Sequence, residues 1–314
     1  MPKISVVLPV YNVGPYLESS LSSLISQSMK DIEIIAVNDG STDNSEEILR
    51  DFKEKYDNVF YYSQSNKGQS AARNYALQHA TGKYIYFMDS DDLIDTDALR
   101  VCYEYVEHTQ ADFIFFDGDI LQEDGAAPIT WNYKRTHLLE EDVRYDGERL
   151  LNLMLDKEKH NCVVWLLFIR RAFLNRIGLR FYEGIIHEDE LFTTILTLSS
   201  DNIFCLQRSF VMHRIRSSST MGIHYSKRNI NCYLTVADEL LKYSQRPIIH
   251  KFLRYTLSKV FYTGHQIPLR EKPSVFWRAL KSGYFVYIGW RSTLVFWLKR
   301  KRQRTIIQSL VKGL

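Results

Sequence analysis

The feature of this sequence with the clearest chemical potential is a cluster of carboxylates. Asp89, Asp91 and Asp92 lie within four residues, directly after the apolar run Tyr84–Met88. Carboxylates this close repel one another unless a cation lies between them. Mg²⁺ or Mn²⁺ binds one or two carboxylates and completes its coordination with phosphate oxygens and water. The cluster therefore indicates either a divalent cation that holds a diphosphate, or a solvated acidic turn in which Asp95 caps the next helix.

Two other polar segments also follow apolar runs. Residues 37–43 (VNDGSTD) contain Asp39 and are typical of a turn that caps a helix. Residues 66–74 (NKGQSAARN) combine a glycine turn, a helix start and the cations Lys67 and Arg73, which is typical of an anion site. Because this segment lacks the patterns GxxxxGK(S/T) and GxGxxG, the sequence disfavours P-loop ATPases and dinucleotide-binding enzymes.

A second acidic segment lies farther along the chain. Residues 187–190 (HEDE) could begin a helix, where the macrodipole favours acidic side chains, or supply a carboxylate base. The segment does not give HExxH, so a zinc protease is not supported. Further on, His213 offers a metal ligand, and Arg214 and Arg216 offer cations for a phosphate.

Hydrophobic periodicity predicts the elements that position these residues. Continuous runs of β-branched and aromatic residues, typical of buried parallel strands, occupy Ile4–Val10, Ile32–Val37, Val59–Tyr62, Tyr84–Met88 and Phe113–Phe116. Segments with apolar residues at helical spacing separate them, at Tyr16–Ser28, Ser45–Tyr56, Gln69–Ala80 and Thr96–His108. This repeat predicts a doubly wound sheet whose polar loops lie at the carboxyl ends of the strands, where ligands bind.

The pattern is weaker beyond residue 118. Residues 119–146 form a long mixed segment. The predicted elements that follow are helices at Gly147–Asp156, Arg171–Ile177 and His187–Ser199, and strands at Ile203–Leu206 and Phe210–Met212. From Tyr225 onward the pattern is helical, with breaks at Pro247, Pro268 and Pro273.

Composition and charge limit the class of protein. The 314 residues are 45% apolar and 25% charged, which is ordinary for globular proteins and excludes disordered and collagen-like chains. The length suggests about two domains. The formal net charge of +3 conceals an asymmetry, because residues 242–314 carry +15 and the remainder carries −12. A basic tail on an acidic body indicates a nucleic acid or a membrane surface as partner.

The cysteines and the apolar runs bear on the compartment. The four cysteines are Cys102, Cys162, Cys205 and Cys232. They lack CxxC and zinc-binding spacing, so we expect reduced thiols in a cytosolic protein, and no signal-peptide pattern precedes the first strand. The best membrane candidate, Gly283–Leu298, has 16 residues with Arg291 in the middle. As a helix it would span about 24 Å, too little to cross a bilayer.

Four segments together resemble a known family. SVVLPVYN at 5–12, VNDGSTD at 37–43, NKGQSAARN at 66–74 and FMDSDDL at 87–93 occur in this order along the predicted strands. They resemble the family 2 glycosyltransferases of the GT-A type. The resemblance implies an α/β fold with a GT-A (Rossmann-like), mostly parallel sheet flanked by helices, and a helical C-terminal extension.

The same resemblance implies a division of labour along the chain. Residues 1–118 would form the half that binds the nucleotide-sugar. Residues 119–222 would form the acceptor and catalytic half of the same domain, and residues 223–314 would form a helical, basic and membrane-associated region.

The resemblance further implies a nucleotide-sugar donor, usually UDP-linked. Pro9 and Tyr11 would shape and wall the base pocket, and Asp39 would accept a hydrogen bond from the uracil imide. Arg73 would complete base recognition, and Lys67 would face the nucleotide.

The acidic residues also match positions of the family. Asp91 matches the ribose-binding position, and Asp92 matches the ligand of Mn²⁺ or Mg²⁺, while Asp89 would orient the loop or join the metal site. Asp189 matches the general base that removes the proton of the acceptor hydroxyl, and Glu188 is the alternative base.

Four further side chains have two interpretations each. His213 is a candidate metal ligand or a structural histidine, because many close relatives have tyrosine at the matching position. Trp131, Trp165 and Tyr182 would form an acceptor platform or belong to the core.

These assignments predict an inverting, metal-dependent glycosyltransferase that extends a lipid-linked glycan of a capsule, exopolysaccharide or O-antigen. In one displacement, Asp189 would deprotonate the acceptor hydroxyl, whose oxygen attacks the anomeric carbon opposite the diphosphate. Two alternatives stay open. A sugar nucleotidyltransferase typically has a Gly-rich, basic loop where this chain has Tyr11–Pro15, and a non-catalytic, membrane-peripheral glycan-binding protein would not need the intact carboxylates.

The basic tail favours a membrane surface over a nucleic acid. It carries no nucleic-acid-binding signature, so we expect no nucleic-acid partner. Its aromatic side chains and the cluster Lys299–Arg304 predict an interfacial helix over Gly283–Leu298 on an anionic cytoplasmic leaflet, or a solvated basic terminus with packed aromatics. We therefore expect a cytoplasmic protein, peripheral at the inner face of the cell membrane.

Overall fold

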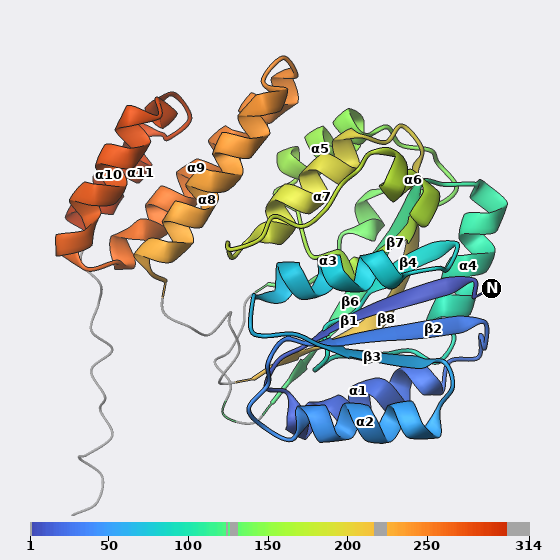
Figure 1. Cartoon of the computed structure of the whole chain (residues 1–314). Helices are drawn as coiled ribbons and strands as arrows, with labels where there is room; N and C mark the ends of the chain where they lie inside the picture. Colours follow the sequence, from blue (N-terminus) through green and yellow to red (C-terminus); the bar gives the residue numbers. More distant parts are fainter. Residues whose placement is uncertain (1, 124, 126–130, 217–224, 300–314) are drawn as a thin grey trace, which may run out of the picture. The chain divides into compact units, whose positions relative to one another are not determined.

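The computed structural model describes residues 2–123, 125, 131–216 and 225–299. The chain splits into two compact units, Met1–Ile223 and His224–Leu314. The first unit contains one sheet with helices on both of its faces, and the described part of the second is helical (Figure 1). Residues from both 1–118 and 119–222 contribute strands to the single sheet.

The sheet is mixed but mostly parallel. Its strands are β1 (Ile4–Val10), β2 (Ile32–Asn38), β3 (Val59–Ser63), β4 (Tyr84–Phe87), β5 (Leu93–Ile94), β6 (Phe113–Gln122), β7 (Leu167–Arg170) and β8 (Ile203–Ile215). Their order is β3-β2-β1-β4-β7-β6-β8-β5. The pairs β1–β2, β1–β4, β2–β3 and β6–β8 are parallel, whereas β7 is antiparallel to both neighbours and β5 is antiparallel to β8. The predicted fold class is confirmed.

The predicted strands differ from the structure in several places. The sequence does not predict β5 and β7, which have only two and four residues. The two strands expected at Ile203–Leu206 and Phe210–Met212 form one continuous strand, β8. The polar residues 207–209 between the two predicted strands are part of β8. The pairing of β8 with β6 shifts register near Asp117, which accommodates them.

Seven helices are described in the first unit. They are α1 (Gly14–Ile25), α2 (Ser45–Lys55), α3 (Gln69–His79), α4 (Ala98–Thr109), α5 (Gly147–Asp156), α6 (Arg171–Arg176) and α7 (Glu188–Leu198). Each agrees with its predicted range to within a few residues. The periodicity therefore places every loop of the candidate site between the correct elements.

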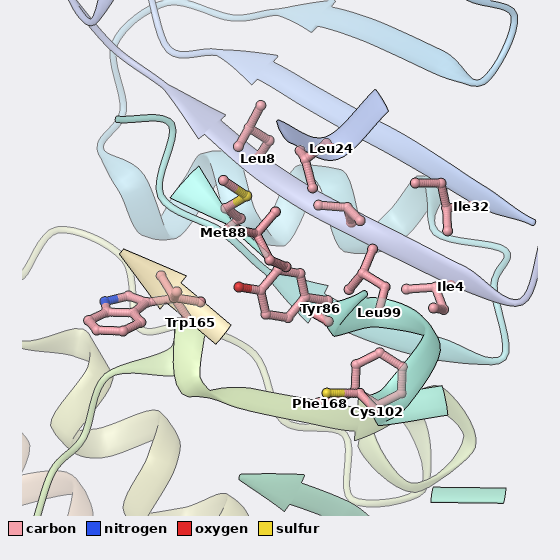
Figure 2. Packing of buried hydrophobic residues seen from close by; sticks show 14 of the residues in the cluster. Ile4, Leu8, Leu24, Ile32, Tyr86, Met88, Leu99, Cys102, Trp165 and Phe168 are labelled. Carbon is pink, nitrogen blue, oxygen red and sulfur yellow. The ribbon is translucent and has the colours of Figure 1, made fainter. Parts of the chain in front are cut away.

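The strands bury both of their faces in two cores, because successive side chains of a strand point in opposite directions. Ile4 and Leu8 of β1 belong to one core with Leu24 of α1 and Leu99 of α4 (Figure 2). Val7 of β1 belongs to the other core, which includes residues of α3, α5, α6 and α7. Both faces of the central strands are apolar, which explains their continuous apolar runs.

The second unit contains α8 (Lys227–Leu240), α9 (Pro247–Thr263), α10 (Lys272–Lys281) and α11 (Trp290–Leu298). Pro247 and Pro273 lie in the first turns of α9 and α10, as the predicted breaks require. The continuous helix expected at Gly283–Leu298 is wrong, because a short 3₁₀ turn at Tyr284–Val286 precedes α11 and the chain is extended at Gly289. Within the described residues, no helix is long and apolar enough to cross a membrane.

We expect Gly147→Ala to destabilise the first unit. Gly147 begins α5 where it packs against α7, and a Cβ there would lie 1.8 Å from the carbonyl oxygen of Thr197. Overpacking against backbone typically costs about 1–3 kcal/mol, measurable as a loss in the free energy of unfolding in urea. Ser199→Ala, an exposed change at the end of α7, serves as the control. Equal stability of the Gly147 variant and the wild type would contradict this packing.

Candidate active site

A cavity of about 450 Å³ lies at the carboxyl ends of β1, β2 and β4. The expected site residues that line it are Pro9, Tyr11, Asp39, Asp89, Asp91 and His213. Arg214 and Arg216, the candidate phosphate-binding cations, also line the cavity. Gln69 and Ile186 line it as well, although the sequence analysis assigns them no role. Lys67, Arg73, Asp92, Glu188 and Asp189 are not part of this lining. The crevice is where an open α/β sheet binds its ligands.

Asp39 holds the loop at one rim of the cavity. Its Oδ1 accepts hydrogen bonds from Gln64 Nε2 at 2.7 Å and from the Lys67 amide at 2.8 Å. Its Oδ2 accepts one from the Gly68 amide at 2.8 Å. Gly68 has φ +91°, a conformation that favours glycine at this turn. The carboxylate of Asp39 therefore shapes the pocket, and Oδ2 still has room for a further donor.

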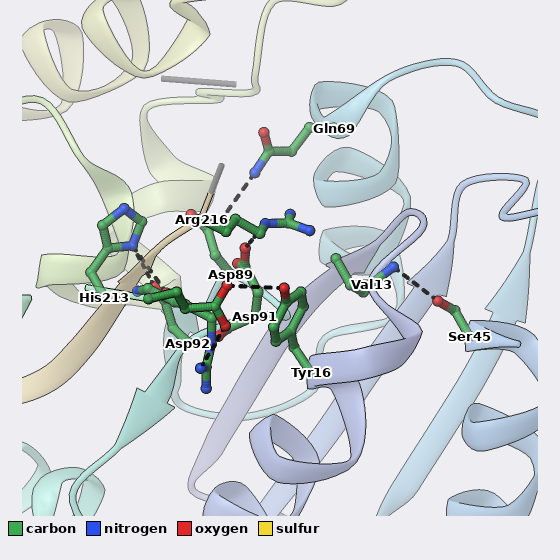
Figure 3. A network of polar contacts seen from close by, with 11 residues as sticks. Val13, Tyr16, Ser45, Gln69, Asp89, Asp91, Asp92, His213 and Arg216 are labelled. Carbon is green, nitrogen blue, oxygen red and sulfur yellow. Dashed lines mark hydrogen bonds and ion pairs between the residues drawn. The ribbon is translucent and has the colours of Figure 1, made fainter. Parts of the chain in front are cut away.

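Strand pairing brings His213 to the acidic cluster. Leu93 of β5 pairs with Met212 of β8, which sets the preceding Asp92 beside His213. His213 Nδ1 lies 3.0 and 2.9 Å from the two carboxylate oxygens of Asp92, and the Arg214 amide donates to Oδ1 at 2.8 Å (Figure 3). Asp92 is completely buried. No local pattern predicts this pair, because its partners are 121 residues apart.

Trp165 supports the histidine. The two rings stack with centroids 4.8 Å apart, and Trp165 is only 2% exposed. The acceptor-platform interpretation is therefore wrong for Trp165, which is a core residue behind the site. Trp131 and Tyr182 are both exposed and stay available for contacts with an acceptor.

Burial and charge together set the protonation of this pair. Burial raises the pKa of Asp92 to about 7, although its bond with His213 opposes the shift. Burial lowers the pKa of His213, but its hydrogen bond to the Asp92 carboxylate and the other nearby carboxylates outweigh this effect, so the pKa lies above its usual value. One ligand atom each from Asp89, Asp92 and His213 lie within 4.8 Å of one another. Two carboxylates and an imidazole are a chemically suitable set for a divalent cation.

Asp91 belongs to a network with the two arginines at the end of β8. Arg216 Nε lies 2.9 Å from Asp91 Oδ2, and Arg214 Nε donates to the Asp91 carbonyl at 2.9 Å (Figure 3). Arg214 Nη1 and the Tyr16 hydroxyl donate to the two oxygens of Glu123, at 3.2 and 3.1 Å. Both guanidinium groups lie over the Tyr16 ring, 5.0 and 5.2 Å from its centroid. The sequence does not predict that Tyr16 and Glu123 belong to the site, because 107 residues separate these two hydrogen-bonded side chains.

Arg73 lies behind the cavity and joins it to the start of α7. Its Nη2 is 3.0 Å from Asp89 Oδ1, and its Nη1 is 3.1 Å from Glu188 Oε1 and 3.0 Å from Asp189 Oδ1. The ring of Phe181 lies beneath the guanidinium, at 5.0 Å. The Arg73 side chain is 2% exposed and does not line the cavity. This geometry does not support the expected contact between Arg73 and the nucleotide base.

The first turn of α7 carries the expected base. His187 precedes the helix in the left-handed conformation, with φ 68°, and three acidic residues follow where the macrodipole favours them. Burial raises the pKa of Asp189 to about 8; Arg73 opposes this shift, and Glu188 and Asp89 add to it. With this pKa the ionised carboxylate is a stronger base than an ordinary aspartate, but below pH 8 the carboxyl is mostly protonated.

Comparison with known proteins agrees with this geometry. Residues 5–178 match the family described as Glycosyl transferase family 2. Glycosyltransferase GlyA of Streptococcus pneumoniae serotype 4 is 33% identical over 227 residues, which are 72% of this chain and 32% of GlyA. The chain thus spans about a third of that relative. The uncharacterized glycosyltransferase YibD of Escherichia coli K12 is 28% identical over 292 residues, 88% of this chain and 82% of YibD.

A solved structure shares the fold. S. aureus TarS 1–349, in complex with UDP-GlcNAc, has a TM-score of 0.71 and 21% sequence identity, covering 93% of this chain and 83% of that chain. The family match spans more than half of this sequence and includes β1, β2 and β4, whose carboxyl ends border the cavity, whereas His213, Arg214 and Arg216 of the lining lie beyond it. The chain belongs to glycosyl transferase family 2.

Proposed function

We propose that this glycosyltransferase moves a hexosyl or N-acetylhexosaminyl unit from a UDP-linked donor to a glycan acceptor, with inversion. The observation that carries the proposal is the bridge from Asp89, in the cavity, through Arg73 to Asp189. It sets a candidate base beside a pocket suited to a nucleotide-sugar. The binding of UDP-GlcNAc by the structurally similar TarS supports a UDP-linked donor.

The nucleotide roles follow the cavity lining. Pro9 and Tyr11 line it at the end of β1 and would wall the base, and Asp39 would accept from the uracil imide through Oδ2. Asp91 would bind the ribose. Lys67, whose side chain is exposed beside the loop, would face the nucleotide.

The diphosphate would lie between the cationic and the metal-binding side chains. Arg214 and Arg216 line the cavity and would bind phosphate oxygens. Asp89, Asp92 and His213 would hold the cation, a donor set that we expect to favour Mn²⁺ over Mg²⁺ because it includes an imidazole. A bound divalent cation would stabilise the negative charge that develops on the departing diphosphate.

Asp189 would serve as the general base. The bond between the anomeric carbon and the diphosphate oxygen breaks as the acceptor oxygen bonds to that carbon from the opposite face, and the hydroxyl proton passes to Asp189. Glu188, which is more buried and shares the same Arg73 nitrogen, is the alternative base. A single displacement inverts the anomeric configuration.

We further propose a lipid-linked acceptor of a bacterial surface glycan, such as a capsule, exopolysaccharide or O-antigen, and a peripheral position at the cytoplasmic membrane. The second unit supports this placement. Trp290, Leu294 and Leu298 form an exposed stripe along α11, 68%, 48% and 73% exposed, and Arg291 and Lys299 lie beside it. Apolar and cationic side chains in this arrangement suit an anionic lipid surface. Of the basic cluster Lys299–Arg304, all but Lys299 lies outside the described residues.

We expect Mn²⁺ affinity to weaken as the pH falls from 8 to 6. Asp92, with a pKa of about 7, and His213, whose pKa is raised, must both be deprotonated to act as ligands. Titration of free Mn²⁺ by electron paramagnetic resonance at several pH values measures this dependence. Asp92→Asn should abolish the site, whereas the exposed Asp57→Asn should not. A pH-independent affinity would contradict the assignment.

We expect Asp189→Asn to lower kcat by about 10²–10⁴-fold, the usual contribution of a general base, with little effect on UDP binding. The assay supplies a panel of UDP-sugars, Mn²⁺ and a lipid-linked glycan fraction from bacterial membranes. Asp201→Asn, at a carboxylate that is 82% exposed, is the matched control. Retained anomeric configuration in the fresh product, seen by NMR, would refute the single displacement.

We expect serine at Trp290, Leu294 and Leu298 together to weaken binding to phosphatidylglycerol vesicles by about tenfold, because the stripe loses its apolar contacts with lipid. Cosedimentation with anionic and neutral vesicles measures the binding. Phe60→Ser, which removes an exposed aromatic side chain from the first unit, is the control. Binding that survives the triple substitution would show that α11 is not the anchor.

A further inference from the structure

Arg73 combines burial with an excess of negative charge around it. Its side chain is 2% exposed, and its guanidinium lies within 3.1 Å of Asp89, Glu188 and Asp189. One positive charge thus faces three carboxylates. Buried ion pairs often stabilise a fold no better than well-packed apolar side chains would, so stability alone is a weak reason for this arrangement.

The three carboxylates come from opposite sides of the proposed reaction. Asp89 lines the donor cavity, whereas Glu188 and Asp189 begin α7. Nη2 of Arg73 binds the first, and Nη1 binds the other two. Because a guanidinium is planar and rigid, its two nitrogens fix the separation of the groups that they bind. The position of Asp189 is therefore tied to that of the donor cavity.

Asn74, the residue after Arg73, supports the Arg73 guanidinium indirectly through Phe181. The Asn74 side chain accepts from the Phe181 amide and donates to the Phe181 carbonyl, both at 2.9 Å. Phe181 then stacks on Phe192 of α7, with ring centroids 4.0 Å apart, and its ring supports Arg73. Of two adjacent residues of α3, Arg73 thus binds Asp189, and Asn74 binds Phe181 in the segment that precedes α7.

The bond from Arg73 distinguishes the two oxygens of Asp189. The guanidinium binds Oδ1, and no hydrogen bond between described residues engages Oδ2. A general base needs one oxygen within roughly 2.6–3.2 Å of the hydroxyl in a fixed orientation. We propose that Arg73 is a positioning residue that fixes Asp189 relative to the donor cavity and leaves Oδ2 for the acceptor hydroxyl. This inference rests on the proposed role of Asp189.

Steady-state kinetics of the full chain with a UDP-sugar, Mn²⁺ and the lipid-linked glycan fraction as acceptor tests the inference. We expect Arg73→Gln to lower kcat by about 10²-fold and to change the donor KM by about threefold or less, because the loss falls on the base. Arg73→Lys keeps the charge without the planar fork and should recover only part of kcat. In an Asp189→Asn background, Arg73→Gln should lower kcat by no more than about threefold, since residues that act as one unit are not additive.

Arg135→Gln is the matched control for the loss of a buried guanidinium. Arg135 lies over the Phe115 ring and donates to the Asn161 carbonyl, away from the cavity lining. The Arg135→Gln substitution should lower the melting temperature, while kcat stays within about threefold of the wild-type value. If Arg73→Gln does not fold, Arg73→Lys completes the same cycle with Asp189→Asn.

Two results would overturn the inference alone. One is an Arg73→Gln enzyme with wild-type kcat, and the other is a double variant whose loss equals the product of the two single losses. A wild-type protein that transfers no sugar would overturn the proposed function, and this inference with it.

Discussion

The charge balance around the buried Arg73 guanidinium is the constraint on which the site depends. Burial alone drives carboxylates toward their protonated forms, and like charges nearby add to that effect. The guanidinium lowers the pKa of Asp189, yet burial, Glu188 and Asp89 still raise it to about 8. The contact with Arg73 therefore limits the rise in the pKa of Asp189 without cancelling it. The two properties that the proposed general base needs thus have different sources: Arg73 sets its position, and burial with the neighbouring carboxylates sets its basicity.

The parallel half of the fold is predictable because its sequence signal is local. β1 and β2 are buried on both faces, so each is a continuous apolar run, and the helices between the strands carry apolar residues at helical spacing. β7 and the middle of β8 lack such a signal. β7 has four residues and is defined by its antiparallel neighbours, and β8 crosses a register shift opposite Asp117 where polar side chains are exposed. Tertiary pairing, not periodicity, makes these strands.

The site divides in the same way. Asp39, Asp89 and Asp91 follow predicted strands, so the sequence places them at one edge of the sheet, and the structure confirms that they line one cavity. Their partners are not predictable from spacing. Arg73 of α3 meets Asp189 of α7 across 116 residues, a contact that depends on the tertiary fold. The motif places Arg73 near the site, but only the packing reveals that it faces carboxylates.

The donor cavity has a charge balance of its own, which bears on how its ligand binds. Asp91 pairs with Arg216, and Asp92 with His213, so the cationic and anionic side chains already offset one another. A divalent cation alone would add positive charge beside the arginine, and a diphosphate alone would add negative charge beside the carboxylates. Such imbalances are costly where burial lowers the effective dielectric constant. Cation and diphosphate bound together offset each other, so we infer that this cavity favours their joint binding, as the leaving group of a nucleotide-sugar requires.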